Sequence, residues 1–359
     1  MRLETLRIQG LRCLSQVELQ LAPGINVFVG ANGAGKTSLL EAAFLLSHAR
    51  SFRSGTRDAL QQRGVSELSI FAAMDYADGR SCRLGLGRTA ARWEAKVDGA
   101  NVPIGQLVRA CAVVCFDPGA HALIAGGAEE RRRYLDWGVF HVEPTFLTAW
   151  RRYQRALKQR NSLLRSGSPP DDTLFAPWEF ELAQTAVQID RQRQDYVDRL
   201  RPTLQGSVAG LLPELGALEL RYRRGWADEQ SLQDLLRDQR SRDLARGHTT
   251  LGVHRADWSL AFEHAPLREH LSRGQEKLAA LACMLAQAEL YAADCGEWPV
   301  VCLDDLASEL DQGHQNAVVA QLAAAGAQVL LSGTELPLAL ADVSPRVFHV
   351  EQGTPTRLL

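Results

Sequence analysis

A glycine-rich segment at residues 30–38, GANGAGKTS, has the residue types and the spacing of a phosphate-binding loop. Glycines at several of its positions let backbone amides curve around an anion, because a β-carbon would obstruct the turn or the approach. Lys36 would bring a positive charge to the β- and γ-phosphates of ATP, and the Thr37 hydroxyl is a suitable ligand for Mg²⁺. The residues predicted to contact the nucleotide are Gly30, Ala31, Asn32, Gly33, Ala34, Gly35, Lys36, Thr37 and Ser38.

Two adjacent carboxylates, Asp304 and Asp305, follow the apolar run VVCL at residues 300–303. Four apolar residues of this kind predict a buried central strand, whose carboxyl end would present both acids beside the phosphate loop. We expect Asp304 to hold Mg²⁺ through water, and Asp305 to orient or deprotonate an attacking water. An ordinary strand ending in an acidic turn is the alternative, and the phosphate loop weighs against it.

A third candidate site lies at residues 271–275, LSRGQ, where an amphipathic helix begins. The Ser272 hydroxyl, the Gly274 amide and the positive end of the helix dipole together would form a second anion site. A plain helix cap, with Glu276 close behind the serine, is the alternative interpretation.

The elements that must position these residues can be read from the hydrophobic pattern. The phosphate loop follows the apolar run INVFV at 25–29 and precedes a helical pattern that starts at Lys36. Alternating residues and Asp-Gly turns over 64–115 predict further strands, which would form a β-rich side lobe. From residue 272 onward, helices and strands alternate. This order is typical of an α/β fold with a mostly parallel sheet and right-handed crossovers.

The middle of the chain has a different character. Apolar residues recur at helical spacing over 146–164 and again over 178–200, and the Pro- and Ser-rich segment 166–172 separates the two stretches. We expect an antiparallel pair of short helices, too short for a long coiled coil. The predicted domains are a discontinuous head, formed by residues 1–120 and 248–359, and a mostly helical arm at 121–247.

Composition places the chain among ordinary globular proteins, with 46% hydrophobic residues, 23% charged residues and a net charge of −2 over 359 residues. The seven cysteines lack zinc-ligand spacing, and we expect them to be reduced thiols. No run of eighteen apolar residues is present, and the first twenty residues resemble strands rather than a signal peptide. A cytoplasmic protein with no membrane contact is therefore expected.

The segment LSRGQ resembles the LSGGQ signature of the ATP-binding-cassette superfamily, except that Arg273 replaces the first glycine. SELD at 308–311 resembles the D-loop of the same proteins. This resemblance implies an ABC-type P-loop ATPase head that pairs head-to-tail as a two-fold homodimer. Ser272, Gly274 and Gln275 of one copy would then contact the γ-phosphate held by the other copy.

Over its whole length the chain resembles the RecF family of bacterial recombinational-repair ATPases, relatives of the SMC heads. The resemblance rests on five segments: MRLETLRIQGLR at the start, GANGAGKTSLLEA followed by SFRS, GGAEERRRYLDWGVF at 126–140, TTLGVHRADW at 249–258, and LDDLASELD. It implies roles in DNA repair, replication and recombination, in which an ATP-driven homodimer clamps duplex DNA near single-strand gaps. It further implies RecR as a partner, with RecO and RecA reached indirectly.

Three departures from the superfamily pattern predict slow ATP hydrolysis. No clear Q-loop glutamine occurs, because VVCFDPGAH at 113–121 occupies its place. No switch histidine stands near Thr334, and Asp305 is one methylene shorter than the usual catalytic glutamate. We expect ATP to act mainly by holding the dimer together, with turnover below roughly 10 per second.

Basic residues indicate a sequence-independent nucleic-acid surface. Residues 121–165 hold nine Lys and Arg against four acids, and two smaller groups consist of Arg50, Arg53 and Arg57, and of Arg221, Arg223 and Arg224. Solvated helix faces and internal ion pairs are the alternative for each group. His254 and Arg255 are equally compatible with a structural hydrogen bond and with a contact to nucleotide or DNA.

An ATP-binding subunit of a membrane transporter remains the alternative function. The long insertion between the phosphate loop and the signature-like segment disfavours it.

Overall fold

The structure, a computed structural model, describes residues 1–53, 60–89, 92–166, 171–227, 229–341 and 343–358. The chain divides into two compact units. Unit 1 comprises Met1–His121 and Lys277–Leu359, and unit 2 comprises Ala122–Glu276. Residues 248–276 therefore belong to the helical unit by their contacts, although the sequence pattern predicts them as part of the head. The division into a functional head, residues 1–120 and 248–359, and an arm, residues 121–247, stays a prediction.

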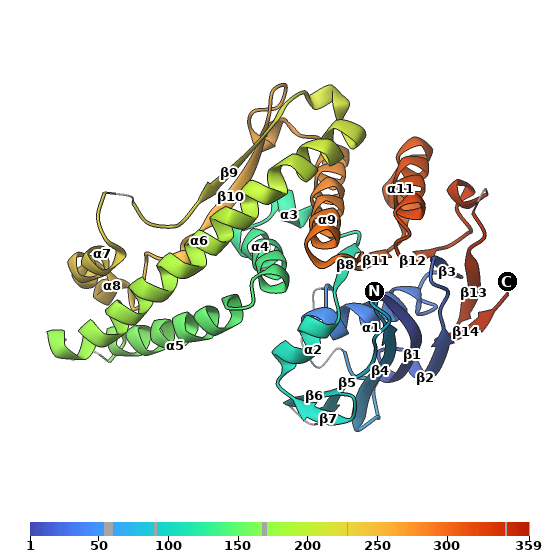
Figure 1. Cartoon of the computed structure of the whole chain (residues 1–359), viewed down its shortest axis with the longest axis horizontal. Coiled ribbons are helices and arrows are strands. Elements are labelled where there is room, and N and C mark those ends of the chain that lie inside the picture. The colour runs from blue at the N-terminus through green and yellow to red at the C-terminus, as the bar shows by residue number, and fades with distance from the viewer. Residues whose placement is uncertain (54–59, 90–91, 167–170, 228, 342, 359) are drawn as a thin grey trace. The chain divides into compact units, whose positions relative to one another are not determined.

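A six-stranded, mostly parallel sheet forms the centre of unit 1 (Figure 1). Its strands are β3 (Ile25–Val29), β8 (Val113–Phe116), β11 (Val300–Leu303), β12 (Val329–Gly333), β13 (Arg346–Glu351) and β14 (Thr354–Arg357). The order is β14-β13-β3-β12-β11-β8, and every pair is parallel except the β13–β14 hairpin. All four residues of β11 are buried, as expected for a strand covered on both faces. The predicted parallel sheet is confirmed.

The β-rich lobe of unit 1 is a six-stranded antiparallel sheet with the order β2-β1-β4-β5-β6-β7. Its strands are β1 (Arg2–Leu11), β2 (Leu14–Gln20), β4 (Glu67–Asp75), β5 (Ser81–Thr89), β6 (Arg92–Val97) and β7 (Ala100–Val102). Burial alternates along β1 and β4, so one face of the sheet packs on the core and the other faces solvent.

Helix α1 (Lys36–His48) contacts strands of both sheets and lies between them. This position explains why eleven of its thirteen residues are buried, including the polar Glu41 and Ser47. Arg12 neutralises the Glu41 carboxylate with two hydrogen bonds of 2.5 and 2.7 Å. The helix that starts at the phosphate loop is thus fixed along its whole length.

The remaining helices of unit 1 are α2 (Ile104–Ala110), α10 (Leu306–Glu309), α11 (Gln312–Ala324) and most of α9 (Arg273–Cys295). Helices α9 and α11 cover the face of the parallel sheet opposite α1 (Figure 1). Within the described residues, α9 is the one helix with the length and apolar composition of a membrane span. However, 67% of its most apolar window is buried inside the structure, as in the core helix of a globular protein.

Unit 2 is mostly helical, with a two-stranded antiparallel sheet of β9 (Leu218–Arg223) and β10 (Asp257–Phe262). Its helices are α3 (Ala122–Ala125), α4 (Ala128–Val142), α5 (Phe146–Leu164), α6 (Asp172–Leu211), α7 (Leu232–Asp238) and α8 (Arg240–Arg246). Helices α5 and α6 pack along each other, and most of the connection predicted as a hinge, residues 167–170, lies outside the described residues. The expectation of two short helices is wrong for α6, which has 40 residues and continues through Pro177 and Pro202.

Buried ion pairs hold the helices of unit 2 together. Arg160 on α5 is fully buried and donates to Asp243 at 2.7 Å and to Glu179 at 3.2 Å. Two further hydrogen bonds, both 2.9 Å long, run from Arg160 to the Thr249 hydroxyl and the Leu236 carbonyl. One arginine thereby ties α5 to α6, α7 and α8. Removing one member of such a buried network costs about 3–5 kcal/mol, because the remaining charge loses its partner.

Candidate nucleotide-binding site and basic surfaces

The predicted phosphate loop connects β3 to α1 in unit 1, and two of its glycines are required by geometry. A β-carbon at Gly30 would lie 2.3 Å from the carbonyl oxygen of Val350 on β13, which is closer than two atoms can approach. Gly35 caps α1 with a φ of 113°, a conformation that favours glycine. The Gly353 amide, in the turn after β13, donates to the Ala34 carbonyl at 2.8 Å. The β13–β14 hairpin therefore contacts the phosphate loop at both Gly30 and Ala34 and supports its conformation.

Lys36 is buried inside the loop that it follows in sequence. Its ammonium donates to the Gly30 carbonyl at 2.7 Å and to the Ala31 carbonyl at 2.9 Å. The positive charge consequently lies within the loop, at the amino end of α1, where the helix dipole also favours an anion. This arrangement fits a triphosphate.

Thr37 and Asp304, the two predicted Mg²⁺ ligands, are in direct contact. The Thr37 hydroxyl donates to Asp304 Oδ1 at 2.9 Å, and the Ser332 hydroxyl donates to the same oxygen at 2.5 Å. The contact arises because β3, β12 and β11 are neighbours in a parallel sheet, so the residues that follow them meet at one edge. Ser332 was not predicted from sequence.

Burial raises the pKa of Asp304, the neighbouring Asp305 raises it further, and the hydrogen bonds from Ser332 and Thr37 oppose the shift. A desolvated carboxylate beside a hydroxyl is a donor set that hard divalent cations prefer. The residues present therefore fit Mg²⁺.

Asp305 has an unusual backbone conformation, with φ of 55° and ψ of 40° at the start of α10. Its amide donates to the Ser332 hydroxyl at 3.0 Å, and its side chain makes no capping bond to the helix. A non-glycine residue held in this region costs about 1–3 kcal/mol, which the surrounding structure must offset. The carboxylate is thus kept out of the helix cap, next to Asp304.

A third carboxylate at this edge, Asp117, was missed as a site residue, although the sequence carries a signal for it. The segments VVCFD at 113–117 and VVCLD at 300–304 are nearly identical, and β8 and β11 pair with Phe116 opposite Leu303. Asp117 and Asp304 therefore follow neighbouring strand ends. Burial, with Asp304 and Glu309 nearby, raises the pKa of Asp117 to about 6, against a hydrogen bond from the Gly119 amide.

The signature-like segment belongs to unit 2, where Ser272 and Gly274 are exposed. Ser272 and Gln275 cap the start of α9 reciprocally: the Ser272 hydroxyl accepts from the Gln275 amide at 3.2 Å, and Gln275 Oε1 accepts from the Ser272 amide at 3.0 Å. Gln275 Nε2 also donates to Glu214 at 3.1 Å. In a single chain the serine thus acts as a helix cap, with Gln275 rather than Glu276 as its partner.

His254 has a structural role within unit 2. Its Nε2 lies 3.0 Å from the Thr249 carbonyl, which only accepts, so this nitrogen carries the proton. Nδ1 then accepts the hydrogen bond from the Tyr153 hydroxyl at 2.6 Å. Burial lowers the pKa of His254 to about 4, which keeps the ring neutral.

The two segments at 126–140 and 249–258 are locked together by arginines. Arg131 forms a bidentate pair with Asp257, and Arg132 donates to the Ala256 carbonyl at 2.9 Å. Arg193 on α6 pairs with Asp136 and donates to the Val253 carbonyl at 2.8 Å. These contacts fix the turn at Val253–Arg255.

The nine cations predicted between 121 and 165 divide into two groups. Five are engaged inside unit 2 by acids or carbonyls: Arg131, Arg132, Arg133, Arg152 and Arg160. The other four are exposed on α5 or at its C-terminal cap and make no hydrogen bond or ion pair with any residue in the described part of the chain: Arg151, Arg155, Lys158 and Arg165. Only the second group is available to an external anion.

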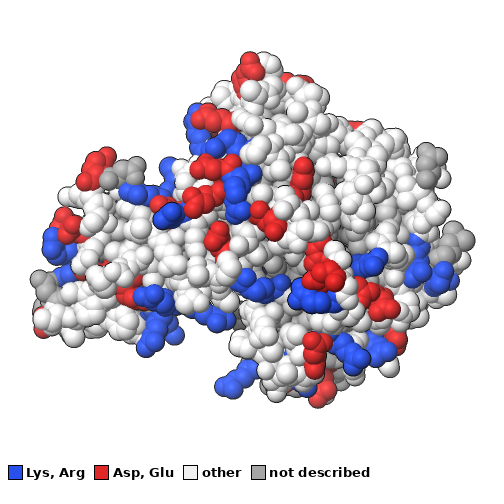
Figure 2. All heavy atoms as spheres, in the orientation of Figure 1, with Lys and Arg blue, Asp and Glu red and all other residues white. Residues whose placement is uncertain are grey.

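Two members of the smaller basic groups lie near acids. Arg221 pairs with Glu219, and Arg53 lies 4.0 Å from Glu41, while Arg57 is outside the described residues. Positive and negative side chains are interspersed over the face shown in Figure 2. A candidate DNA surface is therefore a small patch of cations, such as that on α5, rather than a whole face of the molecule.

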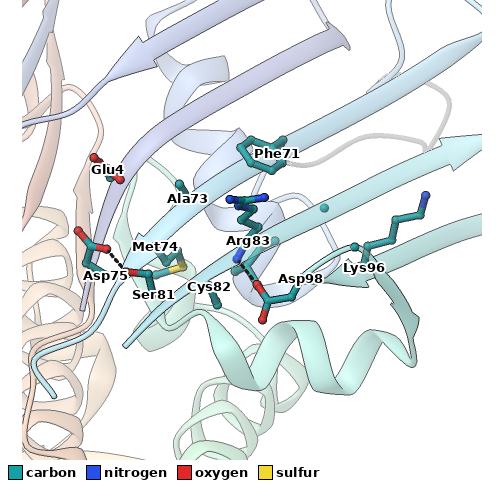
Figure 3. Close-up of a pocket in the computed structure, with 13 residues that line it drawn as sticks. Glu4, Phe71, Ala73, Met74, Asp75, Ser81, Cys82, Arg83, Lys96 and Asp98 are labelled. Atoms are coloured by element: carbon teal, nitrogen blue, oxygen red, sulfur yellow. Dashed lines mark hydrogen bonds between the residues drawn. The ribbon is translucent and has the colours of Figure 1, made fainter. Parts of the chain in front are cut away.

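A separate cleft of about 710 Å³ lies on the solvent-facing side of the antiparallel sheet (Figure 3). Arg83 and Lys96 line it together with three acids, Glu4, Asp75 and Asp98. Asp75 accepts a hydrogen bond from Ser81 at 2.7 Å, and Asp98 accepts one from the Arg83 amide at 2.8 Å. Without an excess of positive charge, this cleft is not a phosphate site.

Comparison with known proteins agrees with this geometry. The family model of the RecF/RecN/SMC N-terminal domain matches residues 2–356. The DNA replication and repair protein RecF of Xanthomonas euvesicatoria pv. vesicatoria (strain 85-10) is 47% identical over 365 residues and covers 99% of both chains. RecF of Stenotrophomonas maltophilia (strain R551-3) is 46% identical over 358 residues, covering 98% of both.

Solved structures give the same result. A structure of the recombination mediator protein RecF with ATP, in the RecFOR pathway, matches with a TM-score of 0.91 and 25% identity over 99% of this chain and 97% of that one. An Smc head bound to the C-terminal winged-helix domain of ScpA matches with a TM-score of 0.58 at 14% identity, covering 100% and 97% of the two chains, which shows the fold alone. The predicted α/β fold, an ABC-type P-loop ATPase head with a β-rich lobe and a helical insertion, is confirmed, and the chain belongs to the RecF family.

Proposed function

We propose that this chain is an ATP-dependent DNA-binding protein of recombinational repair and replication-fork maintenance, working in the cytoplasm. The observation that carries the proposal is the cluster of Lys36, Thr37 and Asp304 at the mouth of the phosphate loop. It is supported by the naming of the relatives as DNA replication and repair proteins and by the RecF structure with ATP. In this proposal the head comprises residues 1–120 and 248–359, and the arm comprises 121–247.

ATP binds along the phosphate loop, where backbone amides and Lys36 receive the phosphates, and Lys36 exchanges its two carbonyl partners for phosphate oxygens. Thr37 and Asp304 hold Mg²⁺, which neutralises phosphate charge when bound. Asp305 orients the attacking water and accepts its proton, while Asp117 adds negative charge beside Asp304.

The second half of each nucleotide site comes from another copy of the chain. Ser272 and Gly274 are exposed, and the reciprocal cap with Gln275 already fixes the geometry of this helix start. A γ-phosphate held by the partner copy would meet the Ser272 hydroxyl, the Gly274 amide and Gln275. A two-fold homodimer of this kind encloses two ATP molecules, each contacted by both chains.

Hydrolysis is slow and releases the dimer. The proposal is supported by the short side chain of Asp305 and by an exposed threonine, Thr334, where the superfamily carries its switch histidine. ATP binding, rather than turnover, then controls the association with DNA.

The cations on α5 form the contact to duplex DNA. Arg151, Arg155 and Lys158 fall within an arc of about 60° on one face of the helix, and Arg165 caps its C-terminal end, so the four extend over about 21 Å. The sequence of α5 contains no acid, and Glu181 on α6, which interacts electrostatically with Arg155, is already paired with Arg152. Contacts of this kind are made to phosphates and carry no base-sequence preference. By family resemblance the DNA contains single-strand gaps, and the partners are RecR directly and RecO and RecA indirectly.

Light scattering of the full chain tests the proposal, with and without ATP and Mg²⁺, and then with duplex or gapped oligonucleotides. We expect a monomer that doubles in mass with ATP and binds DNA in a salt-sensitive manner. The matched Lys36→Ala variant should lose nucleotide binding and pairing together. A mass that does not change on addition of ATP would contradict the proposal. Nucleotide affinity retained by Lys36→Ala would contradict the assignment of the loop.

A further inference from the structure

Unit 2 contains a second basic feature, a cleft of about 610 Å³ beside the end of β9. The side chains that give it its character are Asp190, Tyr222, Arg223, Arg224, Trp226 and Arg255. Three guanidinium groups thus share one cleft with a single carboxylate. All of these residues belong to unit 2, whereas the phosphate loop belongs to unit 1.

Two glycines bring the arginines into the same cleft. Gly225 follows Arg223 and Arg224 in the turn after β9, and Gly252 begins the turn that carries Arg255. A β-carbon at Gly225 would lie 2.5 Å from the Gly252 carbonyl oxygen, so only glycine lets the two turns touch. The Gly252 amide donates to the Gly225 carbonyl at 3.3 Å. The cleft is therefore built from two chain segments held in fixed register.

The acids near these arginines are already engaged. Asp190 accepts the hydrogen bond of the Tyr222 hydroxyl at 2.9 Å. Asp257, the acid nearest Arg223 at 3.8 Å, is held by the bidentate pair with Arg131. Arg255 makes one long hydrogen bond of 3.4 Å to the Thr249 carbonyl. The cleft consequently has a local excess of positive charge.

Aromatic side chains complete the cleft. The Arg224 guanidinium lies over the Trp226 ring, 4.6 Å from its centroid, and donates to the carbonyl of Ala227 at 3.0 Å. The loop thereby fixes both the cation and the ring before any ligand arrives. A flat ring beside arginines is the combination that single-stranded nucleic acids use, with phosphates on the cations and bases stacked on the ring.

We propose that this cleft binds an unpaired nucleic-acid strand, with its phosphates at Arg223 and Arg255 and a base stacked against Trp226. The inference rests on the proposed DNA-binding function and deepens it, because it assigns the unpaired strand of a gapped substrate to a site other than the α5 face. Arginines from two separate chain segments, the end of β9 and the turn at Val253–Arg255, suit successive phosphates of a strand better than one small anion. Because these contacts would be made to phosphates and to the face of a base, we expect binding that does not depend on base sequence.

The test uses the full chain with ATP and compares the single variants Arg223→Ala and Arg255→Ala, and then the double variant, with Arg221→Ala as the control for loss of one charge. Arg221 is on the same strand and is exposed, but it pairs with Glu219 and does not line the cleft. Binding of a labelled single-stranded oligonucleotide and of a duplex of equal length is measured over a range of salt concentrations. We expect the double variant to lose about tenfold or more in affinity for the single strand. The slope of log affinity against log salt should fall by about 1.4, the value for two lost phosphate contacts.

A second variant, Trp226→Leu, removes the ring while keeping the charges. It should weaken single-strand binding by about fivefold or more and leave duplex binding within about twofold of the unaltered chain. Equal losses in Arg221→Ala, equal losses for duplex and single strand, or competition by polyglutamate as effective as by the oligonucleotide would overturn the inference while the proposed function stands. If the unaltered chain bound no DNA, the proposed function would fail as well.

Discussion

Asp304 and Asp305 are adjacent in sequence but differ in burial, backbone conformation and hydrogen bonding. Asp304 is buried and accepts hydrogen bonds from Thr37 and Ser332, whereas Asp305 has a left-handed backbone and a side chain that caps nothing. A carboxylate with its oxygens fixed by hydroxyls suits a cation, and one left without fixed partners suits a water. These surroundings support the proposed division of roles between the two neighbouring acids.

The substitution Asp305→Asn tests this division. The amide keeps the size of the side chain but cannot accept a proton, so ATP-driven pairing should persist while turnover falls by roughly 10²–10⁴. Single-turnover phosphate release together with light scattering measures both effects. Unchanged turnover would assign the water to another group, and Asp117→Asn would then be the variant to compare.

His254 makes the stability of unit 2 depend on pH. Burial lowers its pKa to about 4, below the ordinary value of about 6.5, so the folded state binds the proton less readily than the unfolded state. The stabilisation is complete above about pH 6.5 and is lost as the pH falls from there to about 4. We expect the free energy of unfolding to drop by about 1–3 kcal/mol between about pH 7 and pH 4.5, measured by denaturant titration.

The variant His254→Gln should remove most of that pH dependence, and substitution of the exposed His264 by glutamine serves as the control. If His254→Gln kept the full difference between the two pH values, another group would be responsible.

At the scale of elements, the sequence pattern predicted those features that depend on residues close together in the chain. The phosphate loop, the strand before Asp304 and the parallel sheet were predictable because loop spacing and apolar runs carry their own signals. The contact between Thr37 and Asp304 followed from the rule that parallel strands end at one edge.

Features that depend on distant partners were not predictable. Arg131 looked available to DNA because its partner, Asp257, is 126 residues away in sequence. The length of α6 was underestimated because a proline such as Pro202 usually ends a helix, whereas here the helix continues and buries Leu204, Val208 and Leu211 after the proline. Asp117 had a signal, the repeated pentapeptide, but its meaning depends on the pairing of β8 with β11.

The exposed face of α5 gives a prediction about the element as a whole. Changing Arg151, Arg155, Lys158 and Arg165 to glutamine should reduce duplex affinity strongly and lower the salt slope by about 3–4. The matched control removes four exposed arginines that are paired with acids: Arg7, Arg80, Arg221 and Arg237. Both variants change the net charge equally, so equal losses in a fluorescence-anisotropy titration would mean that only overall charge matters.

At the scale of the whole molecule, the two segments of the proposed nucleotide site lie in different compact units of the chain. The phosphate loop is in unit 1, and the capped helix start at Ser272 is in unit 2. A dimer that joins loop to signature therefore uses one unit of each copy for every nucleotide.

The substitution Ser272→Arg tests this composite site. It places a long side chain on an exposed helix start in unit 2, so the monomer should bind ATP within about twofold of the unaltered chain. ATP-driven pairing should be lost, because the arginine would occupy the space of the opposite phosphates. Equilibrium dialysis measures the first quantity and sedimentation velocity the second. A normal dimer would show that this helix start does not face a second copy.

Strand β3 has a consequence for how the protein is made. Its neighbours in the sheet, β12 and β13, emerge from the ribosome long after it, and the Asn26 side chain bonds a carbonyl 303 residues further along the chain. While those partners are missing, β3 has two bare edges, and the Val350 and Gly353 contacts that shape the loop do not exist. We therefore expect a nascent chain to bind ATP only after Val350 and Gly353 have joined the sheet, so that unfinished copies would not pair with finished ones.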